Sequence, residues 1–158
     1  MSVYQLERSQ KIPGTIEKVW DFISSPSNLE KITPSYMGFK ITGNNLPGKI
    51  YPGLIIRYKL SPLLGIKITW VTEITHVKEK EFFVDEQRVG PYSIWHHQHK
   101  IEAVKNGVLM TDIVTYKPPF GILGRLSNQL FIKKRLESIF DFRKSALEKI
   151  YGKYPPAE

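Results

Sequence analysis

The chain has 158 residues, of which 41% are hydrophobic and 24% charged, as is typical of one globular domain with its own core. It has no cysteine, which excludes disulfide frameworks, thiolate nucleophiles and cysteine-ligated metal centres. Its net charge of +8 is spread along the chain, without an arginine-rich arm, a zinc finger or an RNP-type motif. We therefore expect no nucleic-acid partner, while the charge allows transient contact with an anionic membrane surface.

The first third of the chain predicts a strand and two short helices. Residues 3–12 alternate between the two faces of an amphipathic strand. A Pro-Gly pair ends it, and Thr15 can cap a helix over residues 15–25, followed by a second one over residues 27–33. The N-terminus has no apolar run like that of a signal peptide, and no segment approaches the roughly 18 apolar residues of a membrane span. We expect a cytoplasmic protein.

The middle of the chain changes to strands separated by turns. The predicted strands cover residues 37–42, 54–60, 66–77, 82–89, 92–104 and 108–116. The pair Asn106-Gly107 is a strong hairpin signal between the last two. Consecutive strands with tight turns indicate an antiparallel sheet.

The last part predicts one long helix over residues 122–151. This segment has no proline, and its apolar side chains recur at helical spacing. The main stripe consists of Ile132, Leu136, Ile139, Arg143, Ala146 and Ile150, and it is widened by Leu123, Leu126, Leu130, Phe140 and Leu147. Such a helix would be about 45 Å long at 1.5 Å per residue, so we expect it to lie across the whole sheet.

Four segments in this order resemble the START-like, or SRPBCC, superfamily, and more specifically a bacterial ligand-binding subgroup of it. They are ERSQKIPGTIEKVWDFISSPSNLEKITP, FFVDEQRVGPYSIWHHQHKIE, MTDIVTYKPPFGILGRL and LESIFDFR. The chain is also similar to polyketide cyclase-like and coenzyme Q-binding START proteins. The resemblance implies an α+β helix-grip fold, in which a curved antiparallel sheet of about six to seven strands wraps round a long C-terminal helix, with two short helices after the first strand. It further implies a cavity between sheet and helix that holds a lipid, quinone, isoprenoid or aromatic polyketide.

Three of the four histidines lie in the predicted strand over residues 92–104. Because side chains alternate along a strand, Trp95, His97 and His99 share one face and His96 lies on the other. The large apolar ring of Trp95 suits the interior. We therefore expect His97 and His99 to point inward and His96 to point outward.

The two neighbouring strands add carboxylates to the same interior. In residues 108–116 the expected inner face consists of Met110, Asp112, Val114 and Tyr116. In residues 82–89 two faces remain open, one with Phe83, Asp85, Gln87 and Val89, the other with Phe82, Val84, Glu86 and Arg88. The family-like run VDEQ favours the face with Asp85 and Gln87.

This polar group has several interpretations. The histidines and aspartates could satisfy one another, or they could hold the polar end of a bound molecule. His97, His99 or Asp112 could instead serve acid–base catalysis. A metal site of these three is the least favoured, because two histidines on one strand are weak evidence. We expect no metal and no cofactor.

The expected function is binding, and with it transport or sequestration, of a small and mostly apolar ligand by one START-like domain over residues 1–158. The alternative is a cyclase or dehydratase that uses an inward histidine. Phe120 is expected at the cavity mouth, with Leu126 and Leu130 in its roof. The full expected binding set is Asp85, Gln87, Trp95, His97, His99, Met110, Asp112, Val114, Tyr116, Phe120, Leu126 and Leu130. We expect a monomer or a weak dimer.

Overall fold

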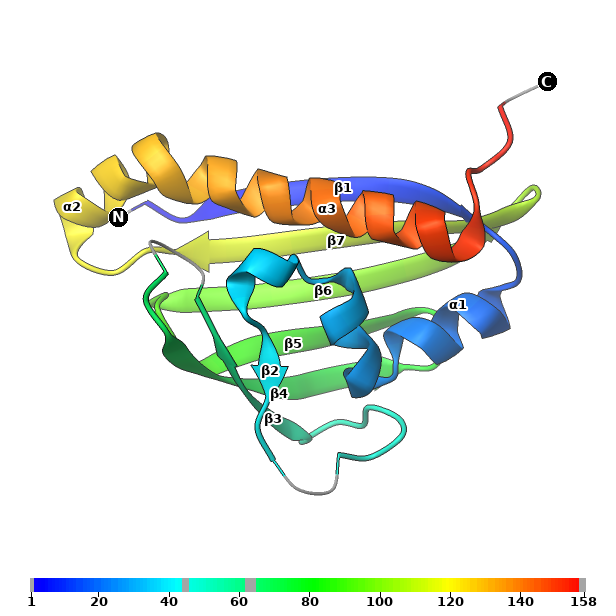
Figure 1. Cartoon of the computed structure of the whole chain (residues 1–158), viewed down its shortest axis with the longest axis horizontal. Coiled ribbons are helices and arrows are strands. Elements are labelled where there is room, and N and C mark those ends of the chain that lie inside the picture. Colours follow the sequence, from blue (N-terminus) through cyan, green and yellow to red (C-terminus); the bar gives the residue numbers. More distant parts are fainter. Residues whose placement is uncertain (1, 44–45, 62–64, 157–158) are drawn as a thin grey trace.

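The computed structural model describes residues 2–43, 46–61 and 65–156, which form a curved antiparallel sheet and the helices packed on it (Figure 1). The strands are β1 (Tyr4–Pro13), β2 (Lys40–Ile41), β3 (Ile55–Leu60), β4 (Ile68–Lys78), β5 (Phe82–Val89), β6 (Ile94–Val104) and β7 (Gly107–Lys117). They lie in the order β1-β7-β6-β5-β4-β3-β2. The predicted antiparallel sheet is confirmed, and the first strand pairs with the last one.

The hairpin between β6 and β7 follows from its sequence. Val104 pairs with Gly107, so Lys105 and Asn106 form the turn, and Asn106 has a φ of 65°, a left-handed conformation that asparagine tolerates. Residues 37–42 differ from the prediction. The 3₁₀ turn η2 (Ser35–Met37) ends at Gly38, which has a φ of 54°, and only two residues of this stretch pair as β2. A left-handed residue interrupts the extended backbone there, so the predicted strand is shortened.

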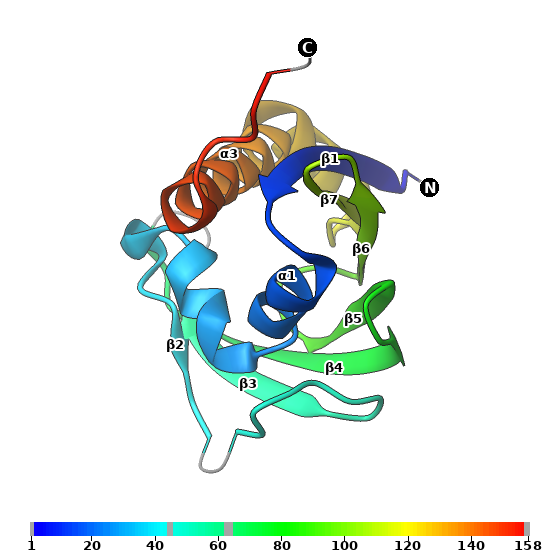
Figure 2. The ribbon, with the colours of Figure 1, turned by 90° about the vertical axis from the view of Figure 1, so that its right-hand side faces the viewer.

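Two short helices follow β1, as predicted. Helix α1 (Ile16–Ile23) begins after Thr15, whose Oγ1 accepts a hydrogen bond of 3.4 Å from the backbone N–H of Lys18. The next, η1 (Pro26–Ile32), is a 3₁₀ helix. Figure 2 shows the sheet curving from β1 round to β2, with the C-terminal helix along the open side and α1 at one end of the enclosed space.

The C-terminal helix runs without interruption through α2 (Gly121–Ser127), the π-helical turn η3 (Asn128–Ile132) and α3 (Lys133–Tyr151). The predicted long helix is therefore confirmed. Within the described ranges no helix combines the length and apolarity needed to cross a membrane. Gly124 is buried near the start of this helix, and its position requires glycine because a Cβ there would collide with the backbone oxygen of Pro119.

The π-helical turn changes which side chains of this helix reach the interior. Asn128, in that turn, is buried, and its Oδ1 accepts a hydrogen bond of 2.8 Å from the Tyr116 hydroxyl. A π turn holds more residues than an α turn, so every residue before it is rotated by about 100°, the angle of one α-helical residue. Leu126, before the turn, is consequently exposed, and Leu130, within the turn, is exposed as well, although the sequence had placed both on the inner face. Their predicted contact with the interior is wrong.

Candidate functional site

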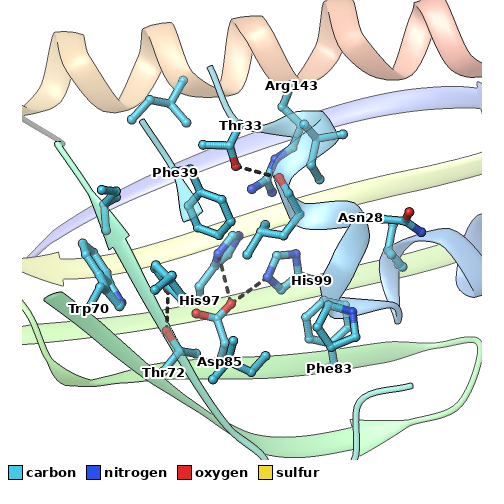
Figure 3. A pocket seen from close by; sticks show the side chains of 18 of the residues that line it. Asn28, Thr33, Phe39, Trp70, Thr72, Phe83, Asp85, His97, His99 and Arg143 are labelled. Carbon is cyan, nitrogen blue, oxygen red and sulfur yellow. Dashed lines mark hydrogen bonds and ion pairs between the residues drawn. The ribbon is translucent and has the colours of Figure 1, made fainter. Parts of the chain in front are cut away.

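A cavity of about 180 Å³ lies between the concave face of the sheet and the helices α1, η1 and α3 (Figure 3). Strand alternation builds most of its wall, because the inward residues of β3 to β7 are large and apolar. The aromatic and aliphatic part of the wall includes Phe39, Ile56, Trp70, Phe83, Trp95 and Phe140. Tyr58 and Thr72 add one polar pair, whose two hydroxyl oxygens lie 2.6 Å apart.

Five side chains at and just behind this wall form one polar group, buried except for the half-buried Asp85, which we call the Asp–His cluster: Asp85, His97, His99, Asp112 and Arg143. Strand register brings four of them together. β6 is the middle strand of three, with Asp85 of β5 opposite His97 on one side and Asp112 of β7 opposite His99 on the other. Arg143 reaches the group from α3 (Figure 3).

Each imidazole ring of the cluster lies between both carboxylates. The Nε2 atom of His97 is 2.9 Å from Asp112 Oδ1, and that of His99 is 2.8 Å from Asp85 Oδ2. The Nδ1 atoms lie 3.3 Å from Asp85 Oδ2 for His97 and 2.9 Å from Asp112 Oδ1 for His99. The two ring centroids are 3.7 Å apart. Arg143 Nη1 donates to Asp112 Oδ1 over 3.0 Å.

The pKa values in the cluster follow from burial and from the opposite charges. Burial alone would lower the pKa of His97, but the charge of Asp85 and the hydrogen bonds that the ring donates to both carboxylates outweigh it and raise that pKa. Burial alone would raise the pKa of Asp85, but the charge of His97 and the hydrogen bonds of both rings lower it. For Asp112, Arg143 is the main partner that overcomes burial and holds the pKa well below its usual value. The arrangement therefore favours charged side chains.

Two buried donors at the cavity wall have no hydrogen-bond partner among the described residues. They are Arg143 Nε and Trp70 Nε1, in residues that are 8% and 6% exposed. Both residues line the cavity, from opposite parts of its wall (Figure 3). A buried N–H without a partner costs about 1–3 kcal/mol, so the cavity presents donors that an acceptor inside it would satisfy.

Asp85, His97 and His99 also offer three metal-ligand atoms within 4.8 Å of one another. The carboxylate here is Asp85, whereas the sequence had suggested Asp112 as the third atom of such a set. Asp85 Oδ2 already pairs with a nitrogen of each ring, and Arg143 adds a positive charge close by. A neighbouring cation disfavours a second one, so we interpret the group as a hydrogen-bonded ion cluster. That no metal is needed stays a prediction.

The inward orientation of His97 and His99 is confirmed, and both are buried. His96 lies on the outer face beside Glu86, as expected. The residues of the expected set that line the cavity are Asp85, Trp95, His97, His99 and Met110. Asp112, Val114 and Tyr116 are buried beside it without lining it. 

Four residues of the expected set do not reach this cavity. The side-chain amide of Gln87 instead exchanges hydrogen bonds with the backbone of Tyr92. Phe120, Leu126 and Leu130 are exposed, so their expected places at the mouth and in the roof are wrong. Phe120 precedes the helix in a left-handed conformation, Leu126 is rotated outward by the π turn that follows it, and Leu130 lies within that turn.

Sequence reasoning missed two residues of the site, Arg143 and Trp70. Arg143 left a signal, because it is the one charged residue in the stripe Ile132, Leu136, Ile139, Arg143, Ala146 and Ile150. A charged residue within a buried stripe needs a partner, and that partner is Asp112. Trp70 left no comparable signal, since a tryptophan in a strand usually packs in the core.

Comparison with solved structures agrees with the architecture. A protein from Chromobacterium violaceum, CV1439, is 10% identical with a TM-score of 0.72, covering 95% of this chain and 99% of that one. The ginseng (Panax ginseng) major latex-like protein 151 is 12% identical with a TM-score of 0.68, covering 94% and 97%. Ara h 8.0201 is 15% identical with a TM-score of 0.59, covering 94% and 99%.

The chain has the helix-grip fold. The latex-like protein and Ara h 8.0201 are of the Bet v 1 type within the SRPBCC superfamily, so the resemblance seen in the sequence is confirmed at the level of the fold. No family model matches the chain, and no curated protein matches it. Identities this low carry no residue roles across. The function of this helix-grip chain therefore has to be argued from its own cavity.

Proposed function

We propose that this chain binds a small, mostly apolar molecule in its cavity, to transport it or keep it sequestered, as one START-like domain in the cytoplasm. The observation that carries the proposal is a cavity with a largely apolar wall and one buried polar cluster. Ligand pockets have this composition, since the apolar wall supplies affinity and a few polar groups set orientation. Bet v 1-like proteins commonly bind hydrophobic ligands, which supports the proposal.

The size of the cavity limits the class of ligand. Its 180 Å³ exceeds the ~150 Å³ that holds a benzene molecule in a protein core. A one- or two-ring aromatic compound or a short isoprenoid matches this space. A long acyl or quinone tail would have to pass out between η1 and α3, whose residues Leu29 and Ile139 line the cavity and are half-buried. We therefore favour a compact isoprenoid or aromatic polyketide over a long-chain lipid.

Native mass spectrometry of freshly purified protein, followed by organic extraction, tests this function. We expect a bound mass that organic solvent releases. Leu29→Trp replaces a half-buried aliphatic side chain of the cavity wall by a bulky indole ring, which should fill the space and abolish the bound mass. Ser27→Trp adds the same ring at an exposed position of the same helix and should leave it unchanged. Repeated absence of any apolar ligand, and failure to load one, would refute the proposal.

The second candidate is an enzyme of the cyclase or dehydratase type. It is favoured by the two carboxylates that flank each of His97 and His99, because a histidine oriented by an aspartate can move a proton near neutral pH. The test is turnover of a short synthetic polyketone, followed by absorbance. Here His97→Ala or His99→Ala should abolish turnover and leave ligand affinity mostly intact. If turnover and ligand affinity fall equally, the histidines serve ligand binding and not catalysis.

The partner proposals are that the chain works as a monomer or a weak dimer and takes no nucleic acid. Sedimentation across a range of concentrations tests the first, and a polarisation assay with a labelled duplex in physiological salt tests the second. A stable dimer at low concentration, or tight and sequence-selective duplex binding, would contradict them.

A further inference from the structure

The charge count of the Asp–His cluster bears on what its ligand must be. Asp85 and Asp112 bring two negative charges, which Arg143 and one imidazolium balance. His97 is the imidazolium of this balance, because the contacts of its ring with Asp85 Oδ2 at 3.3 Å and Asp112 Oδ1 at 2.9 Å outweigh burial and raise its pKa.

Arg143 contributes to this balance through Nη1, which donates to Asp112 Oδ1 over 3.0 Å. A buried donor of a charged group is costly unless it too is paired. Arg143 Nε is the group left to pair, because it is buried at the cavity wall without an acceptor among the described residues.

We infer, on the basis of the binding function proposed above, that the ligand is an organic anion. Its carboxylate, phenolate or enolate oxygen accepts from Arg143 Nε beside the two rings, and its ring system or isoprenoid body fills the apolar part of the cavity. Trp70 Nε1 is an uncharged donor that any oxygen can satisfy. Arg143 is the residue that selects for charge, since the guanidinium group stays protonated at all relevant pH values.

Three compounds with the same ring system test the inference on the wild-type chain: 2-naphthoate, 2-naphthamide and 2-methylnaphthalene. We expect 2-naphthoate to bind at least about tenfold more tightly than the amide, because a hydrogen bond to a charged partner is the stronger one. Equal affinity for acid and amide would overturn the anion assignment while the binding function stands. If none of the three binds, the proposed function itself fails.

The variant Arg143→Met tests whether Arg143 causes the preference for 2-naphthoate over 2-naphthamide. It keeps the length of the side chain and removes the charge, so the acid should lose its advantage over the amide while 2-methylnaphthalene binding persists and reports a folded cavity. Arg57→Met, at an exposed position of β3, is the matched control and should keep the full preference. An unchanged preference in Arg143→Met would contradict the inference. If that variant does not fold, the wild-type comparison still decides.

The start of the C-terminal helix exposes a group of large apolar side chains. Six large apolar side chains before and along the first part of the C-terminal helix are between 51% and 81% exposed, and we call them the apolar stripe: Phe120, Ile122, Leu123, Leu126, Leu130 and Phe131. Their spacing of three and four residues puts most of them on one face of the helix. Soluble proteins rarely expose so much contiguous apolar surface without a partner.

The surroundings of the apolar stripe are entirely basic in sequence. Between Asp112 and Glu137 the chain has five basic residues and no acidic one. They are Lys117, Arg125, Lys133, Lys134 and Arg135, of which Arg125, Lys133 and Lys134 are exposed. An apolar helix face edged by cations is the composition of helices that lie in the headgroup region of an anionic bilayer.

We propose that the apolar stripe docks on an anionic lipid surface. The apolar side chains enter the boundary between headgroups and acyl chains, and the exposed Arg125, Lys133 and Lys134 contact lipid phosphates. Arg135, close by, lies over the ring of Tyr36 at 4.1 Å and lines the ligand cavity. Docking would therefore bring one side of the cavity close to the membrane.

Co-sedimentation with vesicles tests the docking. The full chain should bind phosphatidylcholine vesicles that contain about 30% phosphatidylglycerol, and bind pure phosphatidylcholine weakly. Lys133→Glu with Lys134→Glu should weaken binding by roughly fivefold or more for each residue, and high salt should do the same. Equal binding to both vesicle types would overturn the electrostatic part of the proposal.

Substitutions within the apolar stripe distinguish a membrane from a protein as the partner of this surface. Leu126→Glu with Leu130→Glu should abolish vesicle binding, whereas Ile55→Glu with Val89→Glu, at comparably exposed positions of the sheet, should not. Absence of vesicle binding by the wild type would overturn the proposal. So would a dimer in solution that the Leu126→Glu and Leu130→Glu changes dissociate, since a second copy would then cover the stripe.

Discussion

Replacing Asp112 by Asn removes a negative charge from the point where three positively charged or protonatable side chains meet. The Oδ1 atom of Asp112 lies 2.9 Å from a nitrogen of each histidine ring and 3.0 Å from Arg143 Nη1. Its side chain is 7% exposed, so solvent screens these contacts little. Removing one partner of a buried ion pair costs about 3–5 kcal/mol. An asparagine keeps one acceptor oxygen, so we expect the lower end, about 3 kcal/mol at pH 7.

The loss should depend on pH in a defined direction. The pKa of Asp112 is lowered in the folded chain, so its charge stabilises the fold above the ordinary aspartate pKa of about 3.9. That contribution disappears as the pH falls through the lowered pKa of the folded state. The difference between wild type and Asp112→Asn should therefore be greatest above about pH 5 and should narrow towards pH 3.

Urea unfolding followed by tryptophan fluorescence at several pH values measures this difference. In thermal unfolding, 3 kcal/mol corresponds to roughly 6–12 °C for a chain of this size. Asp21→Asn is the matched control, because Asp21 pairs with Lys49 at the surface and such pairs contribute about 0–1 kcal/mol. A loss in Asp112→Asn below about 1 kcal/mol, or one that stays constant down to pH 3, would refute the assignment of Asp112 as the charged centre of the cluster.

Three further substitutions probe the frame of the site by urea unfolding. Gly124→Ala should destabilise by about 1–3 kcal/mol because its Cβ meets backbone, whereas Gly48→Ala, in open space, should change little. Thr72→Val should cost about 1–3 kcal/mol by leaving the Tyr58 hydroxyl unpaired, and adding Tyr58→Phe should recover most of that loss; a purely additive double variant would contradict the pairing. Thr15→Ala should cost about 1 kcal/mol by removing the cap of α1, and an unchanged stability would argue against that cap.

Strand alternation made the orientation of the histidines readable from sequence. A period of two is a local property of extended backbone, so Trp95, His97 and His99 had to share a face. The Asn-Gly pair likewise defined the β6–β7 hairpin without reference to the rest of the chain. The same reasoning left the face of residues 82–89 open, because both of its sets mix polar and apolar side chains.

The C-terminal helix shows where periodicity stops being sufficient. Its length followed from the absence of proline, but its inner face did not, because the π turn at Asn128 shifts every earlier residue by one position. That turn is held by a hydrogen bond to Tyr116, more than ten residues earlier in the chain. Sequence periodicity assumes a constant rise and rotation per residue, and a tertiary contact can change both.

The sequence by itself determined which side chains of a strand share one face, because the period of two is set by the local extended backbone. It also showed that the polar group would contain two carboxylates and two histidines. It placed Arg143 among apolar neighbours on the helix. Only the tertiary structure decided that Asp85 stands opposite His97 and Asp112 opposite His99, and that Arg143 joins them from across the cavity. Register between strands and the approach of a helix to a sheet depend on the packing of the whole core, which no single segment specifies.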